Sequence, residues 1–267
     1  MDLGLRGKVA LVTGSWRGTG AGIAEVLARE GCHVLVHGLE PGQNGAVLER
    51  LSKLGYQASG VCGDITHEAG SDELIETCRE AAGFPEVLIN NYGVAEAGDW
   101  TSTDSGDWID LYQKNVLSGV RLVHAFAPAM RERKWGRIIF VGTIGSLRPA
   151  ARMPHYYASK AVLPNICVSL AKELSGSGVT VNLVSPGIIA TQEVRTSLEK
   201  RAEKKGWGNT WEAIQGAASR ELFPNPTGRI AEIDEVASLV AFVAGEPASY
   251  INGTNLRVDG GAADSAL

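Results

Sequence analysis

The chain alternates short apolar runs with longer stretches in which apolar residues return at helical spacing. A brief apolar run bounded by turn residues predicts a buried strand, and a return every three or four residues predicts an amphipathic helix. The runs that predict strands are residues 8–13, 33–38, 57–62, 86–90, 136–142, 179–184 and 255–260. The stretches that predict helices are residues 21–30, 43–54, 68–82, 104–131, a helix starting near 155, and 232–244.

This alternation predicts an α/β fold of the Rossmann type, with a doubly wound parallel sheet covered by helices on both faces. Parallel neighbouring strands need a crossover connection, and the helices between the runs provide it. The sequence has no internal repeat, low-complexity tract or linker-like stretch. We therefore expect residues 1–267 to form a single domain.

Residues 192–226 break the rhythm between the strand at 179–184 and the helix at 232–244. This segment holds two tryptophans, Trp207 and Trp211. Open α/β sheets bind ligands outside the carboxyl ends of their strands. We therefore expect the segment to form a lid at that edge whose tryptophans act on substrate binding. A packed helical excursion is the alternative.

Composition and charge argue against several classes of partner. Of the 267 residues, 44% are hydrophobic and 21% charged, and the net charge is −5. This acidity disfavours nucleic acid and anionic membranes as partners. The most basic stretch, residues 131–137, follows a helix, where cations suit the dipole, and we expect it to be a solvated helix end. No apolar run reaches the roughly 18 residues of a membrane span, and the N-terminus lacks signal-peptide features, so we expect a cytoplasmic protein.

The cysteines and histidines show no pairing pattern. Cys32, Cys62, Cys78 and Cys167 lie far apart, which predicts reduced thiols rather than disulfides. The five histidines have neither HExxH nor another ligand spacing. We therefore expect no metal site.

A glycine-rich turn, TGSWRGTG at residues 13–20, lies directly between the first strand and the first helix. Glycines permit a tight turn and close approach of the backbone to a pyrophosphate, and the helix N-terminus offers free N–H groups. The spacing differs from the general G-x-G-x-x-G fingerprint, and glycine clusters also occur for purely structural reasons. The strand–loop–helix context is what favours a nucleotide-binding loop.

Motifs along nearly the whole chain resemble those of the short-chain dehydrogenase/reductase family, including its 3-oxoacyl reductase-like members. In order, the matching residues are TGSWRGTG (13–20), GDI (63–65), NNYG (90–93), Asn115, Tyr156 with Lys160, SPGIIAT (185–191) and VDGG (258–261). Two positions depart from the family pattern. Tyr92 stands where the family has alanine, and Thr143 stands where it has its active-site serine. The resemblance also implies a homotetramer formed through long helices.

The resemblance implies a nicotinamide cofactor that lies over the carboxyl ends of the strands. Asp64 would meet the adenine, the backbone of Ile189 would meet the carboxamide, and Thr191 would meet a nearby polar group. The residues implied in cofactor binding are Gly14, Ser15, Arg17, Gly18, Thr19, Gly20, Gly38, Leu39, Asp64, Ile65, Asn91, Gly93, Tyr156, Lys160, Pro186, Gly187, Ile189 and Thr191.

The end of the strand at 33–38 bears on the choice between NADP and NAD. An acidic residue at this place usually holds the free 2′-hydroxyl of NAD, but the chain has Gly38 there. A 2′-phosphate is therefore not repelled, and the Arg17 guanidinium can pair with it. Against NADP, Leu39 stands where NADP members often carry a second arginine, and Glu40 is close by. We predict NADP, with NAD as the alternative.

The stretch HYYASK, residues 155–160, places two tyrosines ahead of a lysine. Residues three and four apart share one helix face, so spacing alone leaves either Tyr156 or Tyr157 beside Lys160. The YxxxK motif of the family selects Tyr156 as the general acid/base, and Tyr157 is then packing or a wall of the substrate pocket. A free tyrosine has a pKa of about 10. Because a nearby positive charge favours the phenolate, we expect Lys160, with help from the positive charge of an oxidised nicotinamide, to lower the pKa of Tyr156.

Two further residues complete the catalytic set that the resemblance implies. Thr143 keeps the hydroxyl needed to orient a substrate oxygen. The alternative is that Thr143 only fills the strand end and Ser146 supplies the hydroxyl. Asn115 would hold a water that links Lys160 to solvent.

The motifs predict an enzyme that transfers hydride between NAD(P) and a secondary alcohol or ketone. A 3-oxoacyl or other small carbonyl compound is the predicted substrate. A sugar or polyol dehydrogenase is one alternative, and a non-catalytic nucleotide-binding scaffold on the same fold is another. The expected partners are a small-molecule substrate and further copies of the chain, with no nucleic acid and no membrane.

Overall fold

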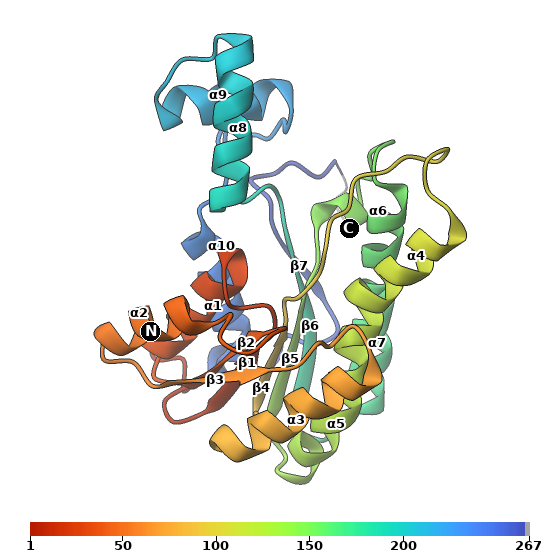
Figure 1. The fold of residues 1–267 in the computed structure, drawn as a ribbon. Coiled ribbons are helices and arrows are strands. Elements are labelled where there is room, and N and C mark those ends of the chain that lie inside the picture. The colour runs from red at the N-terminus through yellow and green to blue at the C-terminus, as the bar shows by residue number, and fades with distance from the viewer. Residues whose placement is uncertain (265–267) are drawn as a thin grey trace.

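Seven strands pair side by side in one parallel sheet in the computed structural model, which describes residues 1–264 (Figure 1). The strand order is β3-β2-β1-β4-β5-β6-β7, so the predicted doubly wound sheet is confirmed. The order reverses between β1 and β4, which is where such sheets bind ligands outside their carboxyl ends. The strands are β1 (Val9–Val12), β2 (His33–Gly38), β3 (Ala58–Cys62), β4 (Val87–Asn90), β5 (Gly136–Val141), β6 (Val179–Pro186) and β7 (Asn255–Val258).

Helices cover both faces of the sheet, which explains why the strands are almost continuously apolar. Along β1, Ala10 and Val12 face one core cluster and Leu11 faces the other. The first cluster is covered by α1 (Gly18–Arg29), α2 (Gly45–Lys53) and α10 (Ile233–Ala244). The second is covered by α3 (Glu68–Ala82), α5 (Ser118–Glu132) and α7 (Leu163–Glu173).

The predicted helix at 104–131 is present but changes geometry in its middle. It begins as α4 (Ser105–Tyr112), becomes the π-helical turn η1 (Gln113–Leu117) and continues as α5. Asn115 lies in η1, and its side chain bonds both backbone groups of Val94. Single π-turns inside helices often mark functional sites, and this one fixes the Asn115 amide toward the loop after β4.

The segment 192–226 forms two helices, α8 (Gln192–Lys205) and α9 (Trp211–Glu221). Figure 1 shows them standing apart from the sheet and its covering helices. They share a small core cluster that includes Leu198 and Ile214. Trp207 and Trp211 pack against this cluster, and the Arg195 guanidinium lies 4.1 Å from the ring centre of Trp211. The tryptophans therefore hold the two helices together.

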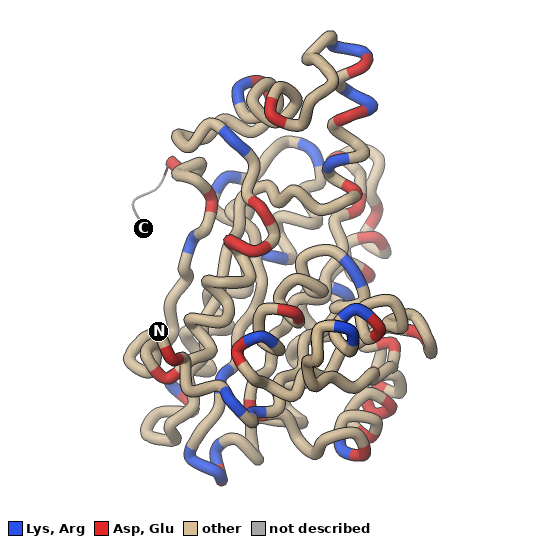
Figure 2. Tube along the Cα trace, turned by 90° about the vertical axis from the view of Figure 1, so that its left-hand side faces the viewer, with Lys and Arg blue, Asp and Glu red and all other residues tan. Residues whose placement is uncertain are grey.

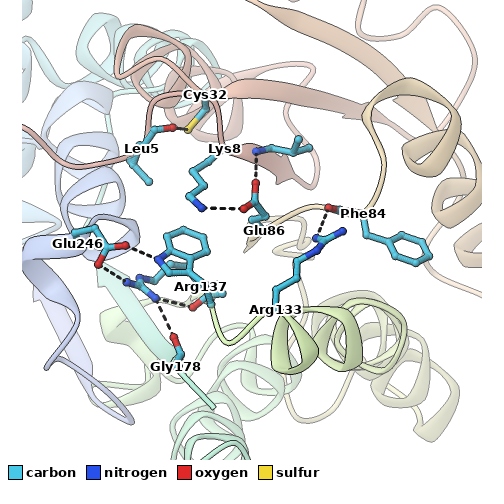
Figure 3. A network of polar contacts seen from close by, with 12 residues as sticks. Leu5, Lys8, Cys32, Phe84, Glu86, Arg133, Arg137, Gly178 and Glu246 are labelled. Atoms are coloured by element: carbon cyan, nitrogen blue, oxygen red, sulfur yellow. Dashed lines mark hydrogen bonds and ion pairs between the residues drawn. The ribbon is translucent and has the colours of Figure 1, made fainter. Parts of the chain in front are cut away.

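The basic stretch at 131–137 is only partly a solvated helix end. Arg137 is 1% exposed, and its guanidinium donates to the Gly178 carbonyl and lies 3.5 Å from the Glu246 carboxylate (Figure 3). Lys8 and Glu86 form an ion pair of 2.9 Å nearby. These residues lie at the amino ends of β1, β4 and β5, so this network braces the edge of the sheet opposite the ligand-binding edge.

Charges of both signs are interspersed along the chain (Figure 2). Within residues 1–264, none of the helices is long and apolar enough to cross a membrane.

Candidate active site

Two cavities meet at the carboxyl ends of the strands. The first has a volume of about 630 Å³ and is lined by the glycine loop and the ends of β4, β5 and β6. The second has a volume of about 700 Å³ and is lined by α6 (Pro154–Ala161) and by residues 222–227. Four residues line both cavities: Ala95, Thr143, Tyr156 and Gly187. A group held at this junction can therefore act on a ligand in either cavity.

The first cavity brings together most of the predicted cofactor residues. Its wall contains Gly14, Arg17, Gly18, Thr19, Gly20, Leu39, Asn91, Gly93, Tyr156, Lys160, Pro186, Gly187, Ile189 and Thr191. These residues come from segments spread over most of the sequence, and the parallel strands carry them to one edge.

The glycine loop has the geometry of a pyrophosphate cradle. Gly14 and Gly18 have φ values of 63° and 56°, which favour glycine. A Cβ on Gly20 would lie 2.4 Å from the Gly14 carbonyl oxygen. Within residues 1–264, the side chain of Arg17 makes no capping bond to the first turn of α1, so backbone N–H groups there face the cavity. These residues fit the phosphates of a dinucleotide.

Four predicted cofactor residues do not line the cavity in the part of the chain that the structure describes. The Ser15 hydroxyl donates to the Val12 carbonyl and accepts from the His37 N–H. Gly38 and Ile65 are buried. Asp64 accepts bonds from the backbone and hydroxyl of Thr66, which stabilises the turn before α3. The buried Ser15 thus supports the glycine loop, and Asp64 supports the turn before α3.

His37 supports the glycine loop and was not predicted to do so. Its imidazole is fully buried, its Nδ1 accepts from the Gly14 N–H at 2.9 Å, and its Nε2 lies 2.9 Å from the Gly63 carbonyl. Because Nδ1 accepts a hydrogen bond and Nε2 faces a carbonyl oxygen, the imidazole is neutral and carries its proton on Nε2. Burial lowers the pKa of His37 to about 4. The only signal in the sequence was a polar residue inside an apolar strand.

We expect acid to destabilise the protein through His37. In the unfolded chain its pKa returns to 6.5, so below that pH the unfolded state binds the extra proton and stability falls. Because one pKa unit is worth about 1.4 kcal/mol, the loss should reach about 3 kcal/mol near pH 4. Urea unfolding at pH 7.5 and 4.5 checks this against His37→Gln, which keeps one donor and one acceptor. A stability gap between wild type and variant that does not change with pH would contradict the assignment.

Tyr92, the departure from the family alanine, lines the first cavity. Its ring centre lies 6.3 Å from that of Trp16, and Trp16 also lines the cavity. Burial raises the pKa of Tyr92, with Asp64 acting in the same direction. Two aromatic rings therefore narrow this part of the nucleotide cavity.

The structure separates the two tyrosines of HYYASK. Tyr156 lines both cavities, whereas Tyr157 lines only the second. Thr143 lines both cavities as well, and its hydroxyl is close enough to Tyr156 to lower the pKa of that tyrosine. The Ser146 hydroxyl instead donates to the Thr143 carbonyl at 2.8 Å. This geometry supports Tyr156 and Thr143 over Tyr157 and Ser146.

Lys160 and Asn115 lie behind this pair. Lys160 is 5% exposed, and its Nζ donates to the Val141 carbonyl at 3.0 Å. The Asn115 Nδ2 donates to Ser159 Oγ at 3.0 Å. A Cβ on Gly93 would lie 2.8 Å from both Asn115 Oδ1 and Lys160 Nζ. Glycine at position 93 is therefore what lets the loop pass between the two side chains.

The pKa of Tyr156 is shifted in the direction opposite to the prediction. Burial raises the pKa of Tyr156 to about 12, and the neighbouring Thr143 side chain offsets this increase only in part. Burial also lowers the pKa of Lys160 to about 8, which weakens its positive charge at mildly alkaline pH. The prediction considered the positive charges of Lys160 and of an oxidised nicotinamide, and it left out the burial of Tyr156 and Lys160.

Arg17 is engaged by a partner that the sequence did not suggest. Its guanidinium pairs with the carboxylate of Glu193 in the first turn of α8. Leu39, the residue that follows β2, lines the same cavity as Arg17.

The second cavity shows which part of segment 192–226 faces it. The segment contributes Leu222, Phe223, Pro224 and Asn225 to the wall, and the next residue but one, Thr227, also lines it. Neither Trp207 nor Trp211 lines either cavity within residues 1–264, so the tryptophans were the wrong residues to expect against a substrate.

Comparisons with known proteins agree with this geometry. A family model described as short chain dehydrogenase matches residues 8–202. The 3-oxoacyl-(acyl-carrier-protein) reductase FabG of Salmonella typhimurium is 34% identical over 261 residues, which cover 97% of this chain and 98% of that protein. The structure of L-sorbose reductase from Gluconobacter frateurii, complexed with NADPH and L-sorbose, superimposes with a TM-score of 0.91 at 29% identity, covering 99% and 100% of the two chains. A 3-oxoacyl-(acyl-carrier-protein) reductase from Agrobacterium tumefaciens with NADP bound gives a TM-score of 0.86 at 33% identity, covering 97% and 96%.

Proposed function

The chain belongs to the short-chain dehydrogenase/reductase family and is an NAD(P)-dependent oxidoreductase; from this premise we propose that it interconverts a ketone and a secondary alcohol at the junction of the two cavities. The observation that carries the proposal is that Tyr156 and Thr143 line both cavities, whereas Lys160 lines only the first. The proton-transferring hydroxyl thus faces the substrate cavity and the nucleotide cavity at once.

Each of the four predicted catalytic residues is proposed to have a different role in proton transfer. Tyr156 gives its hydroxyl proton to the carbonyl oxygen during reduction and takes it back during oxidation. Thr143 orients the same oxygen, and Lys160 and Asn115 form the polar support behind it. A nicotinamide supplies the hydride and, when oxidised, a positive charge. Because burial raises the pKa of Tyr156, this hydroxyl stays protonated at neutral pH, which suits a general acid.

NADP is the proposed cofactor. Gly38 places no carboxylate at the end of β2, and Arg17 lines the nucleotide cavity. Both solved relatives described above hold NADPH or NADP.

The substrate classes to compare are 3-oxoacyl thioesters and ketoses. The wall of the second cavity contains apolar residues such as Ile144 and Met153 and polar residues such as Asn225 and Thr227. One relative described above is named for 3-oxoacyl compounds and another holds L-sorbose. The test follows NADPH absorbance across a panel of both classes. Turnover with at least one ketone supports the proposal. Tight cofactor binding without turnover across the panel would favour the nucleotide-binding scaffold.

Residues 192–226 are proposed to act as the lid of a single domain formed by residues 1–267. Support comes from Phe223, which lines the second cavity and is 37% exposed. Phe223→Ala should raise KM for the ketone by up to about tenfold, roughly 1.4 kcal/mol, because apolar contact area is lost. Cofactor affinity should not change. Trp207→Ala is the matched control, expected to lower the melting temperature by loosening α8 and α9. Equal losses of substrate and cofactor affinity in Phe223→Ala would show that the segment is only structural.

A homotetramer is also proposed, from the family resemblance. An apolar groove of about 920 Å³ between α5 and α7, lined in part by Val123 and Ile166, is a surface through which copies can associate. Light scattering tests the oligomeric state, and a monomer in solution would exclude it.

A cytoplasmic location is proposed as well. Cys32, Cys62, Cys78 and Cys167 are free thiols, which suits a reducing compartment. Fractionation of cells that produce the protein would test this, and recovery outside the cytoplasm would contradict it.

A further inference from the structure

An ion pair connects the glycine loop to the first turn of α8. The Arg17 Nη1 and the Glu193 Oε1 are in contact, although the two residues are 176 positions apart. Both side chains line the first cavity. Arg17 is the residue proposed to bind the 2′-phosphate of NADP. The contact with Glu193 therefore engages the same guanidinium that would distinguish NADP from NAD.

Several groups besides Arg17 favour the charged form of Glu193. Hydrogen bonding to its own backbone N–H, with help from the Thr191 hydroxyl and from Arg17, lowers the pKa of Glu193. An anion in the first turn of a helix is also favoured by the helix dipole. The carboxylate form of Glu193 is therefore favoured by its position at the start of α8 as well as by Arg17.

The pair is weak enough to be broken by a stronger anion. The side chains of Arg17 and Glu193 are 63% and 52% exposed, and exposed pairs contribute little because water and salt screen them. A phosphate binds a guanidinium through two charge-assisted hydrogen bonds and carries more charge than one carboxylate. A 2′-phosphate at the end of β2 can therefore bind the Arg17 guanidinium, but only by displacing the Glu193 carboxylate. This displacement lowers the affinity for NADP.

We propose that Glu193 is a specificity-determining residue that competes with the 2′-phosphate of NADP for Arg17 and so narrows the preference for NADP over NAD. The proposal rests on the proposed role of Arg17 in NADP binding. NAD has a hydroxyl in place of the 2′-phosphate and does not need the Arg17 guanidinium. The contact between Arg17 and Glu193 therefore does not oppose the binding of NAD.

The test compares dissociation constants for NADPH and NADH, measured by fluorescence titration of wild type and Glu193→Gln. An exposed pair corresponds to an advantage of about two- to fivefold. Glu193→Gln should therefore bind NADPH about two- to fivefold more tightly, with NADH within about twofold of wild type. Glu199→Gln is the matched control, because Glu199 is exposed on the same helix, and it should change neither constant.

Repeating the Glu193→Gln substitution in an Arg17→Gln variant tests whether the effect on NADPH affinity depends on Arg17. In Arg17→Gln, where no guanidinium remains to compete for, Glu193→Gln should no longer tighten NADPH selectively. Equal tightening of NADPH and NADH would mean general repulsion of phosphates, and weakening of both would mean that the pair only positions α8; either result overturns the proposal. If wild type itself binds NADH more tightly, the proposed preference for NADP fails, but the effect of Glu193→Gln on the ratio still decides this inference.

Discussion

Replacing Tyr156 by phenylalanine is expected to lower kcat by about 10²–10⁴-fold, the usual contribution of a general acid or base. The change removes one hydroxyl and keeps the ring, so the fold and the contacts that line both cavities should persist. Cofactor affinity should stay close to that of wild type. Steady-state rates at saturating substrate, together with a cofactor titration, measure the two effects separately.

Tyr157→Phe is the matched control for this result. Tyr157 lines only the second cavity and packs closely on Gly145, so losing its hydroxyl should change KM at most. The rate of alcohol oxidation should rise with pH, because the base form of Tyr156 is the form that accepts the proton, and Tyr157→Phe should keep this rise. An inactive Tyr157→Phe beside an active Tyr156→Phe would show that the three-residue spacing to Lys160 carries the chemistry.

Replacing Thr143 by alanine should lower kcat by roughly ten- to a thousandfold, as expected for losing a donor that stabilises the reacting oxygen. Thr143→Ser should keep most of the activity, because the hydroxyl remains. The loss should appear mainly in kcat, since the bond is strongest when the oxygen gains charge. Rates with one ketone from the panel are sufficient to measure it.

Ser146→Ala gives the control for Thr143. The Ser146 hydroxyl bonds the Thr143 carbonyl, so its removal should affect the local turn more than the chemistry. Near-wild-type activity in Thr143→Ala together with a crippled Ser146→Ala would reverse the assignment.

The sheet and the edge that carries the site could be predicted because both depend on local patterns. Apolar runs such as the one that became β1 are buried on both faces, and parallel strands place their carboxyl ends together. The π-helical turn at Asn115 was not predicted, and the two bonds that join Asn115 to Val94 connect segments 21 positions apart, which helical periodicity does not reveal. The ion pair of Arg17 with Glu193 joins still more distant positions.

Electrostatics was the least predictable feature of the site. The spacing of Tyr156 and Lys160 predicts that an ammonium faces the phenol, yet the pKa of each group depends on how deeply it is buried. In the structure, burial raises the pKa of Tyr156 and lowers that of Lys160. His37 shows the same limit, because its neutral state follows from two bonds that the sequence does not reveal.

The transfer of deuterium from labelled cofactor tests the central claim most directly. NADPH that carries deuterium at both hydrogen positions of nicotinamide C4 is incubated with a ketone that the panel identifies as a substrate, and the product is analysed by mass spectrometry and NMR. The account predicts one deuterium on the carbon that bears the new hydroxyl, formed by wild type and by Tyr157→Phe, and formed far more slowly by Tyr156→Phe. A product without deuterium on that carbon, or equal rates in wild type and Tyr156→Phe, would contradict it.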